Sequence, residues 1–152
     1  MRIREVRVAP DAVEATVAVE PGEPLRTSDV PDAVPRILRL LPGLRGHYCD
    51  NDAGRSFPDE LADTELAHLL EHASLEVMAM AGSPAGLAGS TSWDFARDGR
   101  GVFRVRLAYD DDLVAVGALK VAAAALAWCV DPEGAAPDVE GEARRLRGLR
   151  RR

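Results

Sequence analysis

Three segments that alternate polar and apolar residues constrain the fold more than any other feature of this sequence. They are RIREVRV (2–8), VEATVAV (13–19) and GVFRVRLAY (101–109), and the turn-forming APDA separates the first two. Alternation with a period of two is typical of a strand with one buried and one solvated face. The pattern therefore predicts a sheet that is covered on one face.

Residues 59–81 have the spacing of an amphipathic helix. This helix is expected to begin at Asp59 or Asp63 and to end at Ala81, because Gly82 is a typical C-terminal stop. Its apolar side chains recur every three or four positions and form a broad stripe that should be buried. They are Leu66, Leu69, Leu70, Ala73, Val77 and Met80.

Two further helices are expected, at 32–43 and at 112–130. The first has apolar residues at helical spacing and ends at Pro42-Gly43. The second is apolar from 113 to 130 except for Lys120, and the acidic residues 110–112 should cap it. Because alanine dominates this segment and is barely hydrophobic, we interpret it as a buried helix and not as a membrane span.

The segments between these elements are expected to be extended or irregular. LRGHYC (44–49) is predicted to be extended, DNDAGRS (50–56) to be a polar loop, and SPAGLAGSTS (83–92) to be a flexible connection. The order of elements predicts an α+β fold, a two-layer sandwich with helices on one face of a mostly antiparallel sheet of at least four strands. We expect a single domain over 1–137 and an arginine-rich tail over 138–152.

Charge is unevenly distributed along the chain. All 25 acidic residues precede Ala143, and six of the 19 basic residues lie in the last nine positions. The body thus has 13 basic against 25 acidic residues, a net charge of −12, and the tail carries +6. An acidic body argues against nucleic-acid binding, because phosphate contacts need clustered Lys and Arg. The final nine residues are expected to be solvated and poorly ordered.

The cysteines and the N-terminus favour a reducing cytoplasm. Two cysteines, Cys49 and Cys129, are too few for a disulfide framework. The chain does not start with basic residues followed by an apolar stretch, so no secretion signal and no membrane association are expected. Cys129 ends an apolar helix beside Trp128 and is predicted to be a buried thiol.

The stretch AHLLEHASLE (67–76) carries the spacing H-x-x-E-H. Residues four apart are neighbours on one face of a helix, so His68 and His72 can ligate one ion together. Glu71 borders the same face and can reach a metal-bound water without being a ligand. In such sites zinc lowers the pKa of its bound water to about 7, and the glutamate takes the proton as general base.

A third ligand has to come from outside this helix. Glu76 lies eight residues from His68, about 12 Å along the helix axis, and is not expected to complete the site. His47 is the remaining histidine, and Cys49 follows it two positions later. In an extended segment these two side chains share a face, so both are candidates for the third ligand.

Three motifs resemble the N-terminal domain of cyanophycin synthetase. They are LPGLRGHYCD, then AHLLEHASLEVMAMAGSPAG, and later VFRVRLAYDDD, and they span roughly residues 36–128 in order. The resemblance implies a stand-alone metallopeptidase-like domain with a sandwich similar to pitrilysin-type peptidases and S-ribosylhomocysteine lyase. It also implies a zinc ion held by His68, His72 and Cys49, with Glu71 as the base. His47 then becomes an alternative ligand or an outer partner of the site.

The sequence departs from this family in one loop. The family has Gly-Phe-Gly-Arg-Thr-Arg where this chain has GLAGSTS (86–92), so Gly89 and Thr91 replace two arginines. In the family these arginines are expected to contact the carboxyl groups of the polymer, and Arg97 or Arg100 are the nearby candidates to replace them. Ser90 and backbone N–H groups of the loop are candidates to orient a substrate.

The resemblance implies two functions of different classes. The first is a zinc-dependent hydrolase of a peptide-like or amide substrate, with cyanophycin or a related aspartyl-arginine polymer as its candidate substrate. The alternative is a non-catalytic module that binds such a polymer or a related partner. Glu71 favours the hydrolase, because a binding module gains nothing from a base beside two ligating histidines. A metal-dependent lyase acting on a small thioether follows from fold analogy alone. The ATP-dependent ligase regions of the synthetase do not occur in these 152 residues.

Overall fold

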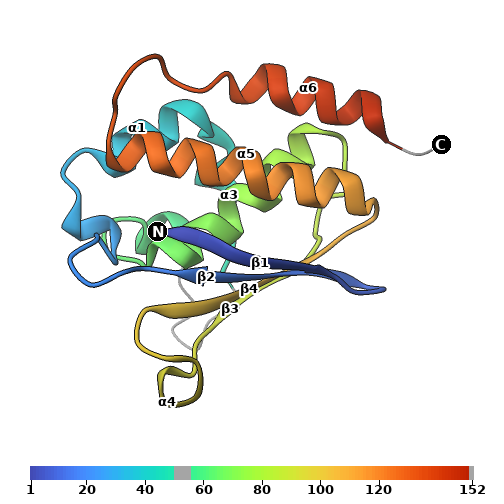
Figure 1. Cartoon of the computed structure of the whole chain (residues 1–152). Helices are drawn as coiled ribbons and strands as arrows, with labels where there is room; N and C mark the ends of the chain where they lie inside the picture. The colour runs from blue at the N-terminus through green and yellow to red at the C-terminus, as the bar shows by residue number, and fades with distance from the viewer. Residues whose placement is uncertain (50–55, 151–152) are drawn as a thin grey trace.

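A four-stranded antiparallel sheet forms one layer of the molecule (Figure 1). The computed structural model describes residues 1–49 and 56–150. The strands lie in the order β1 (Arg2–Val8), β2 (Ala12–Ala18), β4 (Val102–Ala108) and β3 (Gly89–Ser92). The three strands read from the alternating segments are confirmed, and so is the prediction of at least four strands.

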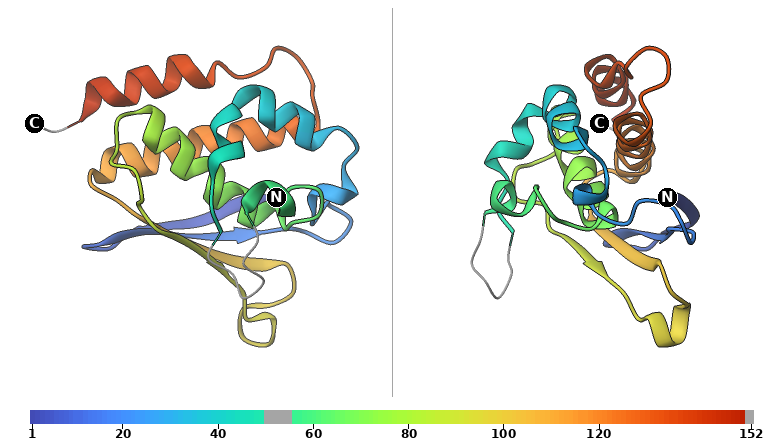
Figure 2. Two further views of the ribbon diagram at one scale, coloured as in Figure 1. Left: turned by 180° about the vertical axis from the view of Figure 1, so that it is seen from behind. Right: turned by 90° about the vertical axis from the view of Figure 1, so that its left-hand side faces the viewer.

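Helices form the second layer. The longer ones are α1 (Ala33–Leu40), α3 (Leu66–Met80), α5 (Asp112–Val130) and α6 (Val139–Leu149). They cover the same face of the sheet, as the views from behind and from the side make clear (Figure 2). The predicted α+β sandwich with helices on one face is therefore confirmed. Among the described residues there are also short helical segments: η1 (Thr27–Asp29), η2 (Pro42–Gly46), α2 (Phe57–Glu60) and α4 (Phe95–Asp98).

The core lies between these two layers. In β4, Phe103, Val105 and Leu107 are buried while Arg104 and Arg106 are exposed, as a period of two requires. Strand β2 is central and mostly buried, whereas β1 is an edge strand and mostly exposed. Charged residues along β1 are a common protection of a sheet edge against pairing with other chains.

Helix α5 runs through the middle of the helical layer. Its N-terminus is capped by Asp111, whose side chain accepts hydrogen bonds from the backbone N–H groups of Leu113 and Val114. In the described part of the chain it is the one helix long and apolar enough to cross a membrane, judged by length and composition alone. Here it packs against α1, α3, α6 and β2. The predicted buried helix is confirmed.

The segment before α3 differs from its prediction. Residues 42–46, expected to be extended in part, form the 3₁₀ helix η2, which Pro42 starts at its first position. Extended backbone follows only from His47, and Tyr48 bridges to Ser56. The predicted polar loop lies outside the described residues except for Ser56. The expected long helix is divided into α2 and α3.

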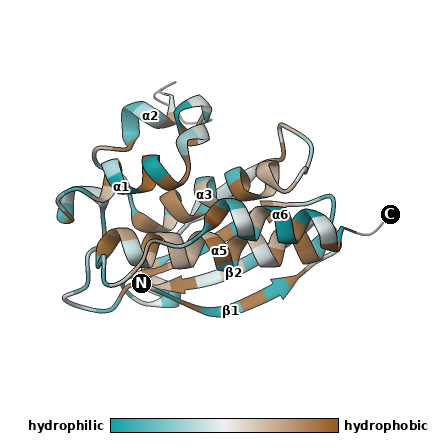
Figure 3. Ribbon diagram, turned by 90° about the horizontal axis from the view of Figure 1, so that it is seen from above, coloured by the Kyte–Doolittle hydropathy of each residue, from teal (hydrophilic) through white to brown (hydrophobic). Residues whose placement is uncertain are grey.

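Two segments that were predicted to be flexible or poorly ordered form regular structure, because each packs against an element that is distant in the sequence. The flexible connection 83–92 ends in β3, because Gly89–Ser92 pairs in register with β4. Of the final nine residues, which were expected to be poorly ordered, 144–149 belong to α6, which lies along α5 (Figure 3), and 151–152 lie outside the described residues. Asp138 caps α6 by accepting a hydrogen bond from Gly141, and Val139, Ala143 and Leu146 are buried.

Candidate metal centre

Helix α3 and the segment after η2 bring three potential metal ligands together. Cys49, His68 and His72 each offer one ligand atom, and these atoms all lie within 4.8 Å of one another. The Sγ atom of Cys49 lies 3.3 Å from Nε2 of His68. His47 is not part of this group, although it contacts it. Of the two candidates for the third ligand, the geometry thus brings Cys49 into the cluster.

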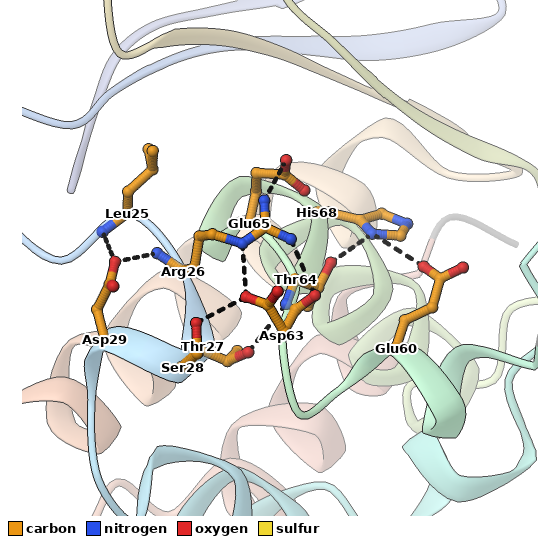
Figure 4. A network of polar contacts seen from close by, with 10 residues as sticks. All are labelled: Leu25, Arg26, Thr27, Ser28, Asp29, Glu60, Asp63, Thr64, Glu65 and His68. Atoms are coloured by element: carbon orange, nitrogen blue, oxygen red, sulfur yellow. Dashed lines mark hydrogen bonds and ion pairs between the residues drawn. The ribbon is translucent and has the colours of Figure 1, made fainter.

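His68 is held on its other side by Thr64. The Oγ1 atom of Thr64 lies 2.9 Å from Nδ1 of His68, which leaves Nε2 for the cluster (Figure 4). Thr64 is itself fixed, because its backbone N–H donates to Oγ1 of Thr27. Burial lowers the pKa of His68, opposed by the nearby carboxylates of Glu60 and Glu65. The ring is therefore neutral near pH 7, as a ligand must be.

His72 is the most deeply buried of the three histidines, with 4% of its surface exposed. The ring of Phe57 stacks on it at a centroid distance of 3.7 Å and an interplanar angle of 13°. Burial, reinforced by the neighbouring His68 and His47, lowers the pKa of His72 to about 3. This imidazole is therefore neutral and held flat against an aromatic wall.

His47 and Glu76 lie next to the cluster. Nδ1 of His47 is 3.0 Å from Nδ1 of His72, and Nε2 of His47 is 2.8 Å from Oε2 of Glu76. Both side chains are largely buried, at 17% and 16% exposure. Glu76 does not complete the cluster, as its distance along α3 predicts, but it reaches the same region through His47.

Glu71 is a buried carboxylate on the sheet side of α3. It is 5% exposed and accepts a hydrogen bond of 2.6 Å from Oγ1 of Thr91 on β3. Burial raises the pKa of Glu71 to about 7, although the Thr91 hydrogen bond and the nearby His47 lower it. Gly89 allows this close approach, because a Cβ atom there would lie 2.6 Å from a Glu71 oxygen. The carboxylate can therefore take up or release a proton near neutral pH.

These residues line a cavity of about 820 Å³. Its walls are α3, the segment 46–49 and residues 83–91, and it includes all four of Cys49, His68, Glu71 and His72. A ligand in this cavity can therefore reach both the cluster that could hold a metal ion and the proton acceptor Glu71.

A comparison with known families identifies the family of this chain. A model described as cyanophycin synthase-like N-terminal domain matches residues 14–131, which is most of the chain. The chain belongs to this family. No curated protein matches the sequence at a significant level. The match contains every residue of the candidate centre and ends before α6.

Gly89 and Thr91, the two positions at which the resemblance led us to expect arginines, lie against Glu71. Gly89 leaves room for its carboxylate and Thr91 binds it. Ser90 lines the cavity but is exposed, and alternation along β3 turns its side chain away from the face of Thr91. Its role in substrate binding stays a prediction. Among the described residues that line the cavity, neither Arg97 nor Arg100 occurs.

Sequence reasoning missed four residues of the centre. Phe57 and Thr64 contact the histidine ligands, Thr91 contacts the carboxylate of Glu71, and Glu76 contacts His47, yet none of the four belongs to the H-x-x-E-H motif. A signal for Glu76 was available, since residues 68, 72 and 76 follow one another at helical spacing on α3. Phe57 and Thr91 approach from other elements, so only the tertiary fold reveals them.

Proposed function

We propose that this chain is a zinc-dependent hydrolase of a peptide-like or amide substrate. The observation that carries the proposal is a buried glutamate beside a Cys-His-His cluster in one cavity. Thiolate and imidazole together suit zinc better than magnesium or calcium, which prefer oxygen ligands. Tetrahedral zinc separates neighbouring N and S ligands by about 3.5 Å, and Cys49 and His68 are 3.3 Å apart.

Cys49, His68 and His72 would hold the zinc ion, which would lower the pKa of a bound water. Glu71 would accept a proton from the attacking water, whose oxygen forms a bond to the amide carbonyl carbon. As the C–N bond breaks, Glu71 would return the proton to the leaving amine. A pKa near neutrality suits both steps, because such a group exchanges protons readily at the working pH. Thr91 would orient the carboxylate through its hydrogen bond.

The lining of the cavity favours a substrate with positive charge. It contains the carboxylates of Glu60, Glu65, Glu71 and Glu76, of which Glu65 is paired with Arg26 and Glu76 with His47, and no Lys or Arg among the described lining residues. Tyr48 and Trp93 also line it and are 73% and 53% exposed, which leaves their rings accessible to a cation. These features support an arginine-bearing substrate such as cyanophycin or a related aspartyl-arginine polymer.

The decisive experiment compares wild type with Glu71→Gln. Both are loaded with zinc and incubated with cyanophycin, a β-aspartyl-arginine dipeptide and an α-aspartyl peptide. Glu71→Gln should keep its zinc and lose about 10²–10⁴-fold in turnover, the usual contribution of a general base. Glu140→Gln is the control, because it removes an exposed carboxylate of α6 that does not line the cavity.

Two outcomes would contradict the proposal. Turnover that survives Glu71→Gln would remove the proposed base. Zinc-loaded wild type that binds the polymer but cleaves none of the three substrates would identify the chain as a binding module instead.

A further inference from the structure

His47 and Glu76 extend from the candidate centre in a continuous line of hydrogen bonds. The line runs from His72 through His47 to Glu76, with heavy-atom distances of 3.0 Å and 2.8 Å. Both distances are normal for hydrogen bonds. A hydrogen bond between two imidazole nitrogens requires one of them to donate and the other to accept, so the positions of the protons along this line are coupled.

The end of the line sets its direction. An ionised carboxylate only accepts hydrogen bonds, so Glu76 requires a proton on Nε2 of His47. An imidazole nitrogen binds a metal only when it carries no proton, so a metal ion on Nε2 of His72 leaves the proton of that ring on Nδ1. Nδ1 of His47 must accept the hydrogen bond from this N–H, and the two hydrogen bonds then run in one direction, from His72 through His47 to Glu76.

Packing keeps the line in place. Glu76 lies against Gly43, where a Cβ atom would come within 1.9 Å of Oε1 of the glutamate. At the other end the Phe57 ring stacks on His72 and restricts its rotation. Leu44 fixes the position of His47, because its carbonyl oxygen accepts the backbone N–H of His47.

His68 is held differently. Its Nδ1 faces the hydroxyl of Thr64, a group that can donate or accept. A hydroxyl therefore tolerates either tautomer of His68, whereas the line to Glu76 selects one tautomer of His72.

We propose that Glu76 and His47 are positioning residues that hold His72 in its Nδ1–H tautomer and so present Nε2 to the metal. The inference rests on the metal centre of the proposed function, but it requires no hydrolysis. It assigns His47 as an outer partner of the centre and not as its third ligand. It also gives a function to a carboxylate that lies outside the H-x-x-E-H motif.

The first test measures zinc affinity of the full chain by competition with a chromophoric chelator. Glu76→Ala and His47→Ala should each weaken zinc binding by about 10–100-fold, the usual effect of losing an outer partner. Gly43→Ala should weaken it as well, because the new methyl group displaces the Glu76 carboxylate while every group of the line remains. Glu60→Gln is the control for charge alone, because its carboxylate lies 3.8 Å from Nδ1 of His68, beyond hydrogen-bond distance. Its zinc affinity should fall much less than that of Glu76→Ala.

The second test reads the tautomer directly from the nitrogen chemical shifts of the histidine rings in metal-free protein. His72 should be the Nδ1–H tautomer in wild type and a mixture in Glu76→Ala, and Glu76→Asp should restore part of the wild-type signal. A structural role alone would not change this signature.

The outcomes separate this inference from the proposed function. Wild-type zinc affinity in both Glu76→Ala and His47→Ala, with an unchanged His72 tautomer, would overturn the inference and leave the hydrolase proposal intact. The inference would also be overturned if His47→Ala lost zinc as completely as His72→Ala while Glu76→Ala bound zinc normally. That result would identify His47 as a ligand. A wild type that binds no zinc would end the hydrolase proposal, while the predicted tautomer would still support the line of hydrogen bonds.

Discussion

Helices α3 and α5 pack against each other in the same layer, yet they bury different chemistry. Every buried residue of α5 is apolar: Val114, Ala115, Ala118, Leu119, Val121, Ala122, Ala125, Leu126 and Cys129. Helix α3 buries a carboxylate, an imidazole and a hydroxyl, those of Glu71, His72 and Ser74. Burying polar groups costs free energy unless each finds a partner. On α3 each does, from Thr91, from His47 and from the carbonyl of Leu70. The difference shows that α5 contributes apolar packing alone, whereas α3 combines apolar packing with polar groups whose hydrogen bonds largely depend on other elements.

The two cysteines show the same contrast at similar burial. Cys49 is 8% exposed and lies against His68, whereas Cys129 is 2% exposed and ends α5. Burial raises the pKa of Cys129 to about 11, partly offset by Arg36 and Arg39, so this thiol stays protonated and unreactive. Its predicted role as a buried thiol is confirmed.

The largest effect is expected when the cysteines are exchanged for serine one at a time. Cys49→Ser should lower zinc affinity more than about 100-fold, because losing a direct ligand exceeds the loss of an outer partner. Cys129→Ser should leave zinc affinity unchanged, and chelator competition measures both. Normal zinc binding in Cys49→Ser, together with its loss in His47→Ala, would assign the third ligand to His47.

A substitution that creates a cavity beside α5 should have the next largest effect, and it should lower stability without changing zinc affinity. Leu119 is 1% exposed, so Leu119→Ala should lower the free energy of unfolding by about 2–5 kcal/mol. Urea denaturation of metal-free protein measures this loss. Zinc affinity of the folded variant should equal that of wild type. A large drop in affinity would mean that the two helices do not separate stability from function.

The pH dependence of stability should reveal the buried charge of α3. Burial raises the pKa of Glu71 from its usual 4.5 to about 7. The protonated side chain therefore contributes fully to the free energy of unfolding below pH 4.5, and this contribution is lost as the pH rises through 7. Glu71→Gln lacks this loss. In metal-free protein the free energy of unfolding of Glu71→Gln should therefore rise relative to that of wild type between pH 5 and pH 8. The rise is up to about 3 kcal/mol, since one pKa unit is about 1.4 kcal/mol.

Denaturation curves of both proteins at several pH values measure that gain. A stability difference that stays constant between pH 5 and pH 8 would show that Glu71 is ionised throughout in the folded state.

The smallest effect concerns the contact between α5 and α6. A Cβ atom at Gly117 would lie 2.3 Å from Cδ2 of the buried Leu146, so Gly117→Ala should cost up to about 2 kcal/mol, since overpacking of about 1–3 kcal/mol is offset by the gain of about 1 kcal/mol of Ala over Gly in a helix. Gly148 is the matched control, because a Cβ atom there meets nothing within 4 Å. Gly148→Ala should be neutral or stabilising by up to about 1 kcal/mol. Equal thermal melting of the two variants would contradict the packing of α6 on α5.

Much of the fold could be predicted because the relevant signals are local. Alternation of polar and apolar residues identified β1, β2 and β4, and helical spacing identified α1, α3 and α5. The short β3 has only four residues and depends on pairing with β4 for its existence. The arginines of α6 suggested a solvated end, but Val139, Ala143 and Leu146 bury a stripe that only a neighbouring helix can cover.

The sequence by itself determined the half of the candidate centre that lies within one helix. His68, Glu71 and His72 keep a fixed relation because α-helical geometry depends only on neighbouring residues. The tertiary structure alone decided the rest. The path of η2 brings Cys49 to His68 and turns His47 toward Glu76, and the pairing of β3 with β4 brings Thr91 to Glu71. These contacts join residues far apart in the chain, and their geometry follows from how the layers pack, which no short stretch of sequence encodes.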